Sequence, residues 1–460
     1  MAESVRTLQY GASWMKPRQQ PQDVCELFRA RLDQIINPHH PLVKLAEQID
    51  WDHFDAVFAD CYCSDTGAPG KAIRLMVGLH YLKYAYNQSD ESVVDRWVEN
   101  PYWQSFCGET HMQHECPIDP SNMTRWRQRV GVDQLNELLK QTIDVAVRRK
   151  HLPERELMQV NVDTTVQEKN ITHPTDSKLL YKAIVKLALS AKARNISLRQ
   201  SYVRVGKRAS VKAGRYAHAK QFKRMHRELR RMRTWVGRLI RDIQRKTTVM
   251  DEQLATLLER CERVRNQRPK DTNKLYSLHE PEVRCISKGK AHKRYEFGQK
   301  VALATTNRRD WFVAAVLVEG NPYDGHTLAA TIDQVESNTG VALSDAYVDK
   351  GYRGHDYQGE AAVHIAGSGS KRLTRTQRRR RKRRSAIEPK IGHAKSENRL
   401  GRCYLKGLPG DAMNVVLAAA GANFQKLLRL LPCAWRRWLN RAGQITFAAV
   451  SRPSHRSLQA

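Results

Sequence analysis

Long apolar runs are missing from this sequence of 460 residues. The longest apolar stretch, VVLAAAGANF at residues 415–424, is too short to span a bilayer, and residues 1–21 contain no apolar core of a signal peptide. We therefore expect no membrane partner and a cytoplasmic location.

A regular cysteine pattern is missing as well. The nine cysteines are an odd number scattered over a long chain, so they do not indicate a disulfide framework, and reduced thiols fit a cytosolic protein. One cluster that can be written as a zinc site consists of Cys107, His111, His114 and Cys116. Its spacing matches no standard pair of ligand knuckles, so we interpret the cluster as a loop between helices and assign no metal to it.

Acidic residues are scarce relative to basic ones. The chain has 79 Lys and Arg against 47 Asp and Glu, which gives a formal net charge of +32 and a pI near 10.0. Such an excess predicts a polyanionic partner. An anionic membrane surface would normally require an amphipathic or lipidated anchor, and none is evident in the sequence. Nucleic acid is therefore the favoured partner.

Residues 1–155 have the pattern of helices joined by short loops. The segment DPSNMTRWRQRVG (119–131) has a Pro-Ser start and a Gly stop, and a further helix is predicted over 133–150. Helix-turn-helix segments of this size place a basic helix in a DNA groove. The candidate DNA contacts are Arg125, Arg127 and Arg129. The alternative is a packed bundle with a solvated basic face.

Two separate parts of the chain predict a mixed sheet. In MQVNVDTTVQEKN (158–170), β-branched residues alternate with polar ones, which is the pattern of a half-buried strand with Asp163 on its open face. From residue 290 the sequence predicts strand, turn, strand, helix, strand and strand, and Gly340 closes the helix. This succession indicates a fold of α/β type.

A large helical insertion is predicted between these parts, over residues 177–289. Apolar residues recur there at spacings of 3 and 4, which is the heptad pattern of a coiled coil or a helical hairpin. The seam consists of Phe222, Met225, Leu229, Met232, Val236, Leu239 and Ile243 and continues, after a slip, through Met250, Leu254, Leu257, Cys261 and Val264. Lys and Arg crowd the other faces, so we favour a DNA-contacting arm over a solvated face on an oligomerising helix.

Three acids are candidate ligands of divalent ions. Asp349, in DAYVDKGYRG, faces out at the carboxyl end of a strand, so its carboxylate converges with that of Asp163 if the two strands are neighbours. Glu388 lies beside Pro389 at the start of a helix. Three carboxylates at one point repel one another unless cations lie between them, and hard oxygen ligands select Mg²⁺ or Mn²⁺. Two such ions can activate a water or a 3′-hydroxyl for in-line displacement at a phosphodiester.

Basic residues flank the third acid. Arg384 precedes Glu388 by four residues and Lys395 follows it by seven, so both are candidate contacts to the phosphates of a scissile strand. The run KRLTRTQRRRRKRR (371–384) would be a disordered loop when unpaired and would neutralise several phosphates against DNA. A nuclear-localisation peptide has the same composition.

Each acid also has a structural interpretation. Asp163 alone is more often a strand-end cap, and Asp349 alone fits turn chemistry. Glu397 is a rival third acid, but it lacks the Arg and the Lys at the spacings found around the favoured one. Asp324 and His326, in NPYDGHTL, are interpreted as a helix cap and a structural loop histidine and not as metal ligands.

The motifs VDTT, YVDKGYRG and R-x3-E-x6-K, behind a helical region with DPSNMTRWRQRVG, resemble the bacterial insertion-sequence transposases of the DDE class, close to the insertion-sequence-five group. The resemblance covers about residues 40–430. It implies an RNase H-like core with Asp163 on the first strand, Asp349 just after the fourth and Glu388 on a helix behind the fifth. The family signature has Tyr where this chain has Arg381, so that residue is a candidate phosphate contact by charge alone.

These observations divide the chain into four parts. The predicted parts are a helical DNA-binding or dimerisation domain (1–155), an RNase H-like α/β catalytic core (156–176 with 290–432), a helical, partly coiled-coil insertion (177–289) and a basic C-terminal tail (433–460).

A DNA transposase of this class is expected to bind terminal inverted repeats as a homodimer or larger homo-oligomer. The catalytic residues and metal ligands implied by the resemblance are Asp163, Asp349 and Glu388, holding two Mg²⁺ or Mn²⁺ ions. The expected partners are double-stranded transposon ends, flanking DNA and target DNA, and the expected location is the bacterial nucleoid. Two alternatives stay open: an RNase H-like nuclease without strand transfer, and a catalytically inactive DNA-binding relative.

Overall fold

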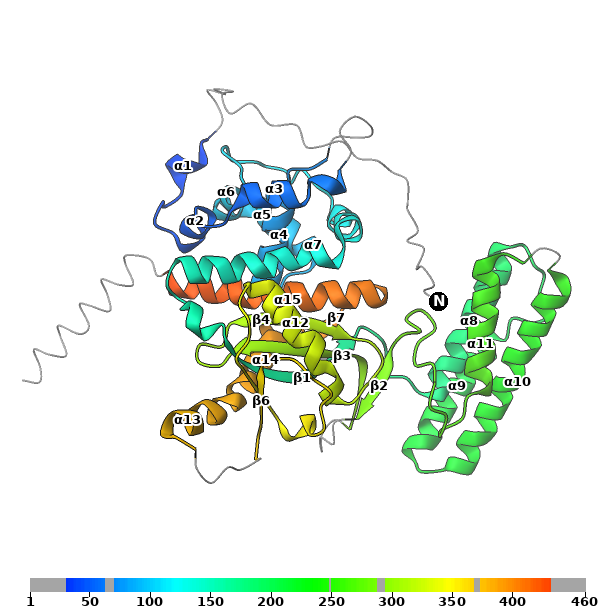
Figure 1. Ribbon diagram of the computed structural model, residues 1–460. Helices are drawn as coiled ribbons and strands as arrows, with labels where there is room; N and C mark the ends of the chain where they lie inside the picture. Colours follow the sequence, from blue (N-terminus) through cyan, green and yellow to red (C-terminus); the bar gives the residue numbers. More distant parts are fainter. Residues whose placement is uncertain (1–29, 63–69, 248–249, 288–293, 368–372, 432–460) are drawn as a thin grey trace, which may run out of the picture.

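The computed structural model describes residues 30–62, 70–247, 250–287, 294–367 and 373–431. The predicted basic tail, residues 433–460, lies outside the described residues. Figure 1 shows helices from the first part of the chain, a sheet flanked by further helices, and a helical bundle to one side. No helix in the described part of the chain is long and apolar enough to cross a membrane.

Helices of 3 to 29 residues, several of them with polar caps, make up the described part of the chain before the sheet. They are α1 (Leu32–Ile35), α2 (Pro41–Ala46), α3 (Trp51–Val57), η1 (Ala59–Cys61), α4 (Ile73–Ala85), α5 (Asp90–Glu99), α6 (Pro101–Phe106), α7 (Pro120–Arg148) and η2 (Glu154–Glu156). Ser89 and Ser92 form a capping box at α5, and Asp119 caps α7. The predicted stop at Gly131 is a kink inside α7, because Gly131 has φ 83° and ψ −175°.

A mixed sheet of seven strands follows within the described residues. The strands are β1 (Gln159–Lys169), β2 (Arg284–Ser287), β3 (Tyr295–Thr306), β4 (Phe312–Val318), β5 (Asp345–Val348), β6 (Ala362–Ile365) and β7 (Arg402–Cys403). The main order is β2-β3-β1-β5-β6, with β4 also on β3 and β7 on β1. β1 runs antiparallel to β3 and parallel to β5.

The strand and helix succession predicted after residue 290 is confirmed. It consists of β3, β4, α12 (Leu328–Thr339), β5 and β6, and Gly340 closes α12 with φ 67°. Sequence reasoning missed β2, which lies within the predicted insertion, and β7, which has two residues. Both are too short for a periodic pattern to be visible.

The prediction that β1 is half-buried is wrong. Asn161 is 0% exposed and Thr165 is 6% exposed, although both lie on the face expected to be open. Helices that follow the sheet cover this face. They are α13 (Arg375–Arg383), the short turn η5 (Arg384–Ala386) and α14 (Ile387–Glu397). Asp163 is therefore enclosed by strands on its edges and by these helices above it.

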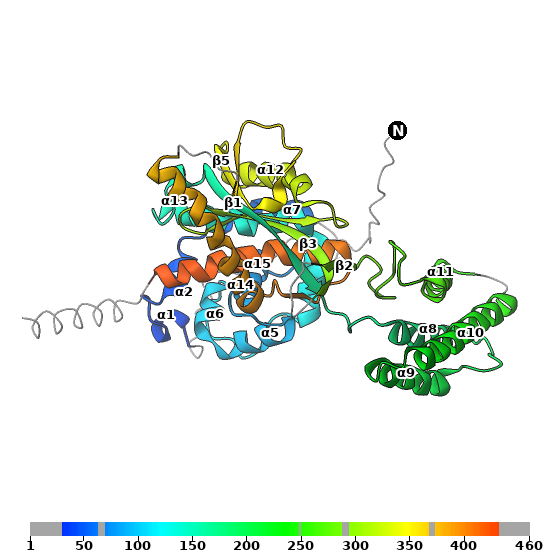
Figure 2. The same ribbon diagram turned by 90° about the horizontal axis from the view of Figure 1, so that it is seen from below.

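The first helices and the sheet share one hydrophobic core. Helix α15 (Gly407–Leu430) lies between them and packs on α4, α7 and β4 (Figure 2). The amide of Asn423, on α15, donates to the Phe312 carbonyl at 2.8 Å and to Thr142 Oγ1 at 3.1 Å. Because a buried polar group without a partner costs free energy, these bonds fix how α7, α15 and β4 stack.

The helical insertion is a bundle with its own core. Its helices are α8 (Asp176–Ala193), α9 (Val203–His218), α10 (Phe222–Lys246) and α11 (Glu252–Asn266). The heptad seam of α10 packs against α8, α9 and α11 of the same chain: Met232, Val236 and Ile243 are each 0% exposed. Phe222, at the start of the seam, is 54% exposed. The middle of the seam is therefore filled within one chain, whereas its members Phe222 and Met250 are exposed.

A buried ion cluster joins the end of β1 to the segment that returns from the bundle. Lys169 Nζ lies 2.9 Å from Asp411 Oδ1, on α15, and 3.1 Å from Glu280 Oε2. The Gly407 N–H donates to Glu280 Oε2 at 3.1 Å. All three charged side chains are at most 7% exposed, so the two carboxylates depend on this one lysine for neutralisation.

Candidate active site

Asp163 lies in the interior of β1, the strand between β3 and β5. The strand continues to Lys169, so Asp163 is not a strand-end cap. Asp163 Oδ1 accepts a hydrogen bond from the Thr164 N–H at 2.8 Å, and Oδ2 lies 3.9 Å from Arg384 Nη1. The side chain is 17% exposed.

Asp349 follows β5 directly, on the side of the sheet where Asp163 lies. β5 is the parallel neighbour of β1, as the convergence of the two acids requires, and Tyr347 is paired with Asn161. Asp349 is two residues beyond Tyr347 and Asp163 is two residues beyond Asn161, so the two side chains extend from the same face at the same level. Asp349 Oδ1 accepts the Gly351 N–H at 2.8 Å, which caps η4 (Lys350–Tyr352).

Glu388 lies in the first turn of α14 and is linked to Asp163 through one arginine. Arg384 Nη2 donates to Glu388 Oε1 at 2.8 Å, while its Nη1 faces Asp163. The Glu388 side chain is 58% exposed, whereas the Arg384 side chain is 16% exposed. The guanidinium thus occupies the position between two of the three predicted acids.

Two buried asparagines hold the helices that carry Arg384 and Glu388. Asn161 Nδ2, on β1, donates to the Arg383 carbonyl at 3.3 Å, and Asn307 Nδ2 donates to Asn161 Oδ1 at 2.6 Å and to the Arg380 carbonyl at 3.1 Å. The backbone at the end of α13 is therefore fastened two residues from Asp163 along the strand. This attachment fixes where η5 and α14 begin.

Asp324 lies close to these acids and was misinterpreted from the sequence. It begins the short turn η3 (Asp324–Thr327) and does not cap it, because the residue at the cap position is Tyr323. Asp324 Oδ1 instead accepts hydrogen bonds from Thr164 Oγ1 and from Lys300 Nζ, each at 2.9 Å. Lys300 is a buried charged residue directly before the apolar run 301–304 of β3, and this was the signal in the sequence that an acid had to lie beside it.

The buried Tyr352 hydroxyl is near the three aspartates. Tyr352 is 0% exposed, and its hydroxyl makes no hydrogen bond of normal geometry within the described residues, although the Thr327 side chain is close enough to act on its pKa. Burial, with the negative charges of Asp163, Asp324 and Asp349, raises the pKa of Tyr352 far above its usual value. The phenol is therefore neutral and available as a donor.

The donor chemistry of this site suits a hard divalent ion. No group of three or more His, Cys, Asp or Glu side chains among the described residues is arranged to hold a metal ion. Arg384 supplies the positive charge between Asp163 and Glu388 instead. An ideal Cβ at Gly351 would lie 3.0 Å from Asp349 Oδ1 and 3.2 Å from Asp324 Oδ2, so this glycine leaves a small space beside two carboxylates. The carboxylate donors are chemically suited to a divalent cation, and in the present arrangement Arg384 occupies the position between Asp163 and Glu388.

The basic run before Glu388 is a helix in its described part and not a loop. Thr374 and Gln377 form a capping box at the start of α13; residues 371–372 lie outside the described residues. One face of α13 lines a groove of about 690 Å³ beside the start of β1. Six arginines line this groove: Arg155, Arg308, Arg375, Arg379, Arg380 and Arg383. Such a concentration of guanidinium groups matches a chain of phosphates.

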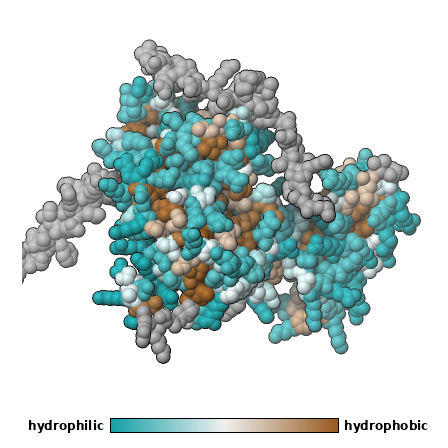
Figure 3. Space-filling model, viewed as in Figure 1, coloured by the Kyte–Doolittle hydropathy of each residue, from teal (hydrophilic) through white to brown (hydrophobic). Residues whose placement is uncertain are grey.

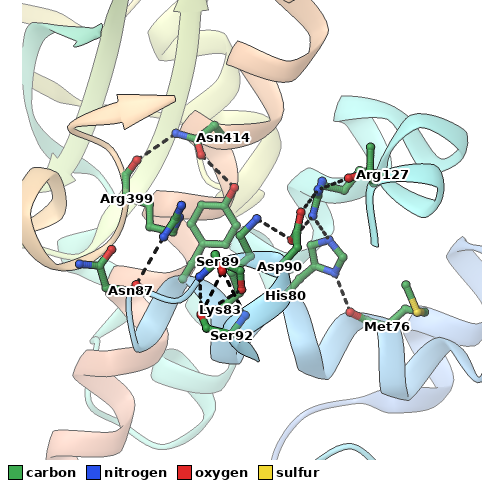
Figure 4. A network of polar contacts seen from close by, with 12 residues as sticks. Met76, His80, Lys83, Asn87, Ser89, Asp90, Ser92, Arg127, Arg399 and Asn414 are labelled. Carbon is green, nitrogen blue, oxygen red and sulfur yellow. Dashed lines mark hydrogen bonds and ion pairs between the residues drawn. The ribbon is translucent and has the colours of Figure 1, made fainter. Parts of the chain in front are cut away.

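Arg127, predicted to contact DNA, lies inside the core. It is 1% exposed, and its guanidinium donates to Asp90 Oδ1 at 3.0 Å, to Asp90 Oδ2 at 2.6 Å and to His80 Nε2 at 3.2 Å (Figure 4). Lys83 Nζ donates to the same carboxylate at 2.8 Å. The prediction for Arg127 is therefore wrong, because an acid on α5 neutralises the charge and packing excludes DNA.

The other predicted DNA contacts have different surroundings. Arg125 is exposed, and Arg129 is half-buried with its guanidinium carbon 5.2 Å from the centre of the Tyr62 ring. Arg381, on α13, and Lys395, on α14, are half-buried. Contact of these four side chains with DNA stays a prediction.

The rival acid Glu397 lies at the other end of α14. Its carboxylate is 2.6 Å from His393 Nδ1 and 3.3 Å from Arg429 Nη2. These contacts direct it toward α15 and away from β1, so Glu388 is the acid of α14 that lies with Asp163.

Two protein-family models match the chain. Residues 30–129 match a family described as "Transposase domain (DUF772)", and residues 255–424 match a family described as "Transposase DDE domain". The second match includes Asp349 and Glu388, whereas Asp163 lies outside it.

One curated relative comes from Rhizobium meliloti and is described as "Uncharacterized protein ORF8 in nfe locus". It is 54% identical over 208 residues, which are 45% of this chain and 100% of that protein. No solved structure matches the chain.

Proposed function

Because the chain belongs to the DDE transposases of bacterial insertion sequences, we propose that it excises and inserts the element that encodes it. It binds the terminal inverted repeats, cleaves the DNA at the element's ends and joins those ends to target DNA. The observation that carries this proposal is the arrangement of three acids: Asp163 on β1, Asp349 after the parallel strand β5, and Glu388 joined to Asp163 through Arg384.

The proposed ligands of two Mg²⁺ or Mn²⁺ ions are Asp163, Asp349 and Glu388. A divalent ion held by these carboxylates would polarise the scissile phosphate and lower the pKa of the attacking hydroxyl. In the first reaction, a water oxygen bonds to phosphorus and the bond to the 3′-oxygen breaks, which releases a 3′-hydroxyl. In the second reaction, that hydroxyl bonds to a target phosphorus and displaces a target 3′-oxygen, and no covalent protein intermediate forms.

Arg384 and Lys395 are the proposed contacts to the scissile strand. Arg384 already lies between two acids, so it can exchange a carboxylate for a phosphate oxygen without a large movement. Arg381 is a further phosphate contact in place of the family's tyrosine. The arginine-lined groove beside α13 takes the flanking duplex, whose phosphates match its charge.

The remaining DNA contacts are assigned to the first helices and to the bundle. Arg125 and Arg129 are the proposed contacts of α7. The bundle carries exposed cations along α10, which favours a DNA-contacting arm, and Figure 3 gives a mostly hydrophilic view of its surface. These exposed cations are Lys223, Arg224, Arg227, Arg230, Arg231, Arg238, Arg241, Arg245 and Lys246. We propose that a homodimer or larger oligomer brings two ends together, as synapsis of two inverted repeats requires.

The proposed divisions of the chain follow these roles. They are a DNA-binding or dimerisation part (1–155), an RNase H-like catalytic core (156–176 with 290–432), the bundle (177–289) and a basic tail (433–460). The spacing R-x3-E-x6-K supports assignment to the insertion-sequence-five group.

An excision assay tests the catalytic assignment. The purified full chain is incubated with Mg²⁺ and a plasmid in which a marker is bracketed by the terminal sequences that flank its gene. Asp163→Asn, Asp349→Asn and Glu388→Gln are each expected to reduce end cleavage more than about a hundredfold, since each removes a charged ligand worth several kcal/mol in the transition state. Glu397→Gln, on the same helix as Glu388, is the matched control and is expected to cleave normally.

Wild-type cleavage by the Asp163 or Asp349 variant would overturn the mechanism. Loss of cleavage with Glu397→Gln and not with Glu388→Gln would move the third acid to Glu397. Joined products separate the proposal from its alternatives: cleaved ends without any joining to a target plasmid indicate a nuclease. Salt-dependent DNA retention with no cleavage by the wild type indicates a binding protein without catalytic activity.

A further inference from the structure

A fourth carboxylate, that of Asp324, lies beside the proposed catalytic acids. It enters from the connection between β4 and α12, so it comes from a different element than Asp163, Asp349 and Glu388. Its Oδ1 is fully occupied by the ammonium of Lys300 and the hydroxyl of Thr164, each at 2.9 Å. Thr164 directly follows Asp163, so this hydroxyl fixes Asp324 to the strand that carries the first catalytic acid.

The second oxygen of Asp324 is oriented toward the site. No described residue donates a hydrogen bond to Asp324 Oδ2 or to Asp349 Oδ2, whereas Oδ1 of each side chain has a donor. Asp324 Oδ2 and Asp349 Oδ2 lie 3.2 and 3.5 Å from the same point, the position of an ideal Cβ on Gly351. Two carboxylate oxygens without donors facing one small space repel each other, and a cation between them removes the repulsion.

The buried hydroxyl of Tyr352 is an independent sign that the space takes a ligand. Tyr352 is 0% exposed and its hydroxyl has no hydrogen bond of normal geometry in the described residues, which is uncommon for a buried donor. Asp163, Asp324 and Asp349 all act on this hydroxyl electrostatically, so it lies near these acids. A water on a bound cation would satisfy this donor.

We propose that Asp324 is a further carboxylate ligand of the divalent ion site formed by Asp163 and Asp349. Thr164 is a positioning residue, because its hydroxyl binds Oδ1 and sets the direction of Oδ2, whereas the Lys300 ammonium only balances the charge of the carboxylate. The inference rests on the proposed metal-dependent function, but it concerns a residue outside the three acids of that proposal. Gly351 is required at its position because any side chain there would fill the space between Asp324 and Asp349.

Binding of Mn²⁺ to the full-length protein tests the assignment without any catalytic readout. Free Mn²⁺ is measured by its electron paramagnetic resonance signal during titration of wild type, Asp163→Asn, Asp349→Asn, Asp324→Asn and Asp333→Asn. Asp324→Asn is expected to weaken Mn²⁺ binding at least tenfold, and Asp349→Asn at least as much. Asp333, an exposed acid on α12, is the matched control, and its variant is expected to bind as wild type does.

A second pair of variants separates a ligand from a structural residue. Asp324→Asn leaves the Lys300 ammonium buried without its carboxylate partner. The double variant Lys300→Gln with Asp324→Asn removes both charges and so restores the charge balance. If Asp324 is a ligand, this double variant is expected to lose as much Mn²⁺ affinity as Asp324→Asn alone. Lys300→Gln alone removes a competing cation from Asp324 and is expected to bind Mn²⁺ as tightly as wild type or more tightly. A purely structural role predicts the opposite, a weaker site when Lys300 is removed. The thermal midpoint without metal is measured for each variant, and the double variant is the decisive one if the single variant does not fold.

The outcomes distinguish the inference from the proposed function. Normal Mn²⁺ affinity in the folded Asp324 variants, with loss in Asp349→Asn, overturns the role of Asp324 and leaves the three-acid site intact. Normal affinity in Asp349→Asn and Asp163→Asn as well overturns the metal site itself. Weaker binding in Lys300→Gln also overturns the assignment, because a ligand carboxylate gains from the loss of a neighbouring cation.

Discussion

The buried contact between His80 and Arg127 predicts a specific loss of stability in mild acid. The His80 side chain is 0% exposed, its Nδ1 lies 2.7 Å from the Met76 carbonyl, and its Nε2 lies 3.2 Å from Arg127 Nη1 (Figure 4). A carbonyl accepts and a guanidinium donates, so only the neutral ring with its proton on Nδ1 satisfies both contacts. A second proton on Nε2 would face the guanidinium directly.

Burial, reinforced by the charge of Arg127, lowers the pKa of His80 from 6.5 to about 3. Below pH 6.5 the unfolded chain therefore binds a proton that the folded chain does not bind, so acid favours unfolding. Between pH 7.5 and pH 5.0 this one group costs about 2 kcal/mol of unfolding free energy, from the linkage relation with those two pKa values. Asp90 adds nothing in this interval, because its carboxyl is ionised in both states above its usual pKa of 3.8.

Urea unfolding followed by tryptophan fluorescence at pH 7.5 and pH 5.0 measures the effect. Other titrating groups contribute equally to wild type and to a His80→Gln variant, so the difference between the two proteins isolates His80. Gln keeps an acceptor for Arg127 and removes the titration. Wild type is expected to lose about 2 kcal/mol more than the variant over this interval.

An exposed histidine supplies the control. His326→Gln is expected to keep the wild-type pH dependence, because His326 lies on the surface near Tyr323. Equal losses in wild type and His80→Gln, within about 0.5 kcal/mol, would refute the reasoning, since they would mean that His80 is not held neutral in the folded chain.

Three further predictions concern the site, the groove and the buried ions. Gly351→Ala is expected to reduce end cleavage at least tenfold with little change in thermal midpoint, because its Cβ would lie about 3 Å from two carboxylate oxygens; normal cleavage would mean that the space is not used. Arg379→Gln is expected to lower the slope of log affinity for duplex DNA against log salt by about 0.9, the value for one phosphate contact, and an unchanged slope would remove Arg379 from the interface. Lys169→Met is expected to destabilise the fold by about 3–5 kcal/mol, because Glu280 and Asp411 would be buried without a cation, and an unchanged thermal midpoint would show that the cluster is not neutralised by Lys169.

The sheet and two of its acids were predictable because the signals were local. Alternation along residues 158–170 located β1, and the order of strands and helix after residue 290 brought Asp349 to the end of a strand. The two acids could converge only if their strands were neighbours in the sheet, and β1 and β5 are indeed parallel neighbours. Arg384 precedes Glu388 by four residues, which is about one turn of helix, and its Nη2 donates to Glu388 Oε1 at 2.8 Å.

The errors arose where the deciding partner is distant in the sequence. Arg127 has the same local pattern as its exposed neighbour Arg125, but Asp90 lies 37 residues earlier and neutralises it. Asp324 has the sequence pattern of a cap, and its actual partner Thr164 is 160 residues away. Periodicity reports which face of an element is apolar; it does not report which charged side chain from another element will reach that face.

The heptad seam of α10 gives the same lesson for packing. A spacing of 3 and 4 predicts an apolar face that needs partners, but the partners of Val236 and Ile243 are the neighbouring helices of the bundle. A coiled coil with a second chain and an intramolecular bundle bury the same residues, so the pattern cannot distinguish them. The core formed with α8, α9 and α11 buries the middle of the seam within one chain, and Phe222 and Met250 are its exposed members.

The charges around the site also explain how it can accept a ligand at low cost. In this structure Lys300 balances Asp324, and Arg384 balances Asp163 and Glu388. The two cations differ in their surroundings: Lys300 is 7% exposed and held to a backbone carbonyl as well, whereas the Arg384 contact to Glu388 involves a side chain that is 58% exposed. An exposed pair of this kind is worth at most about 1 kcal/mol, so Glu388 can leave Arg384 easily. The guanidinium would then be free for a phosphate oxygen beside Asp163, and the same exchange would free Glu388 to face the other acids.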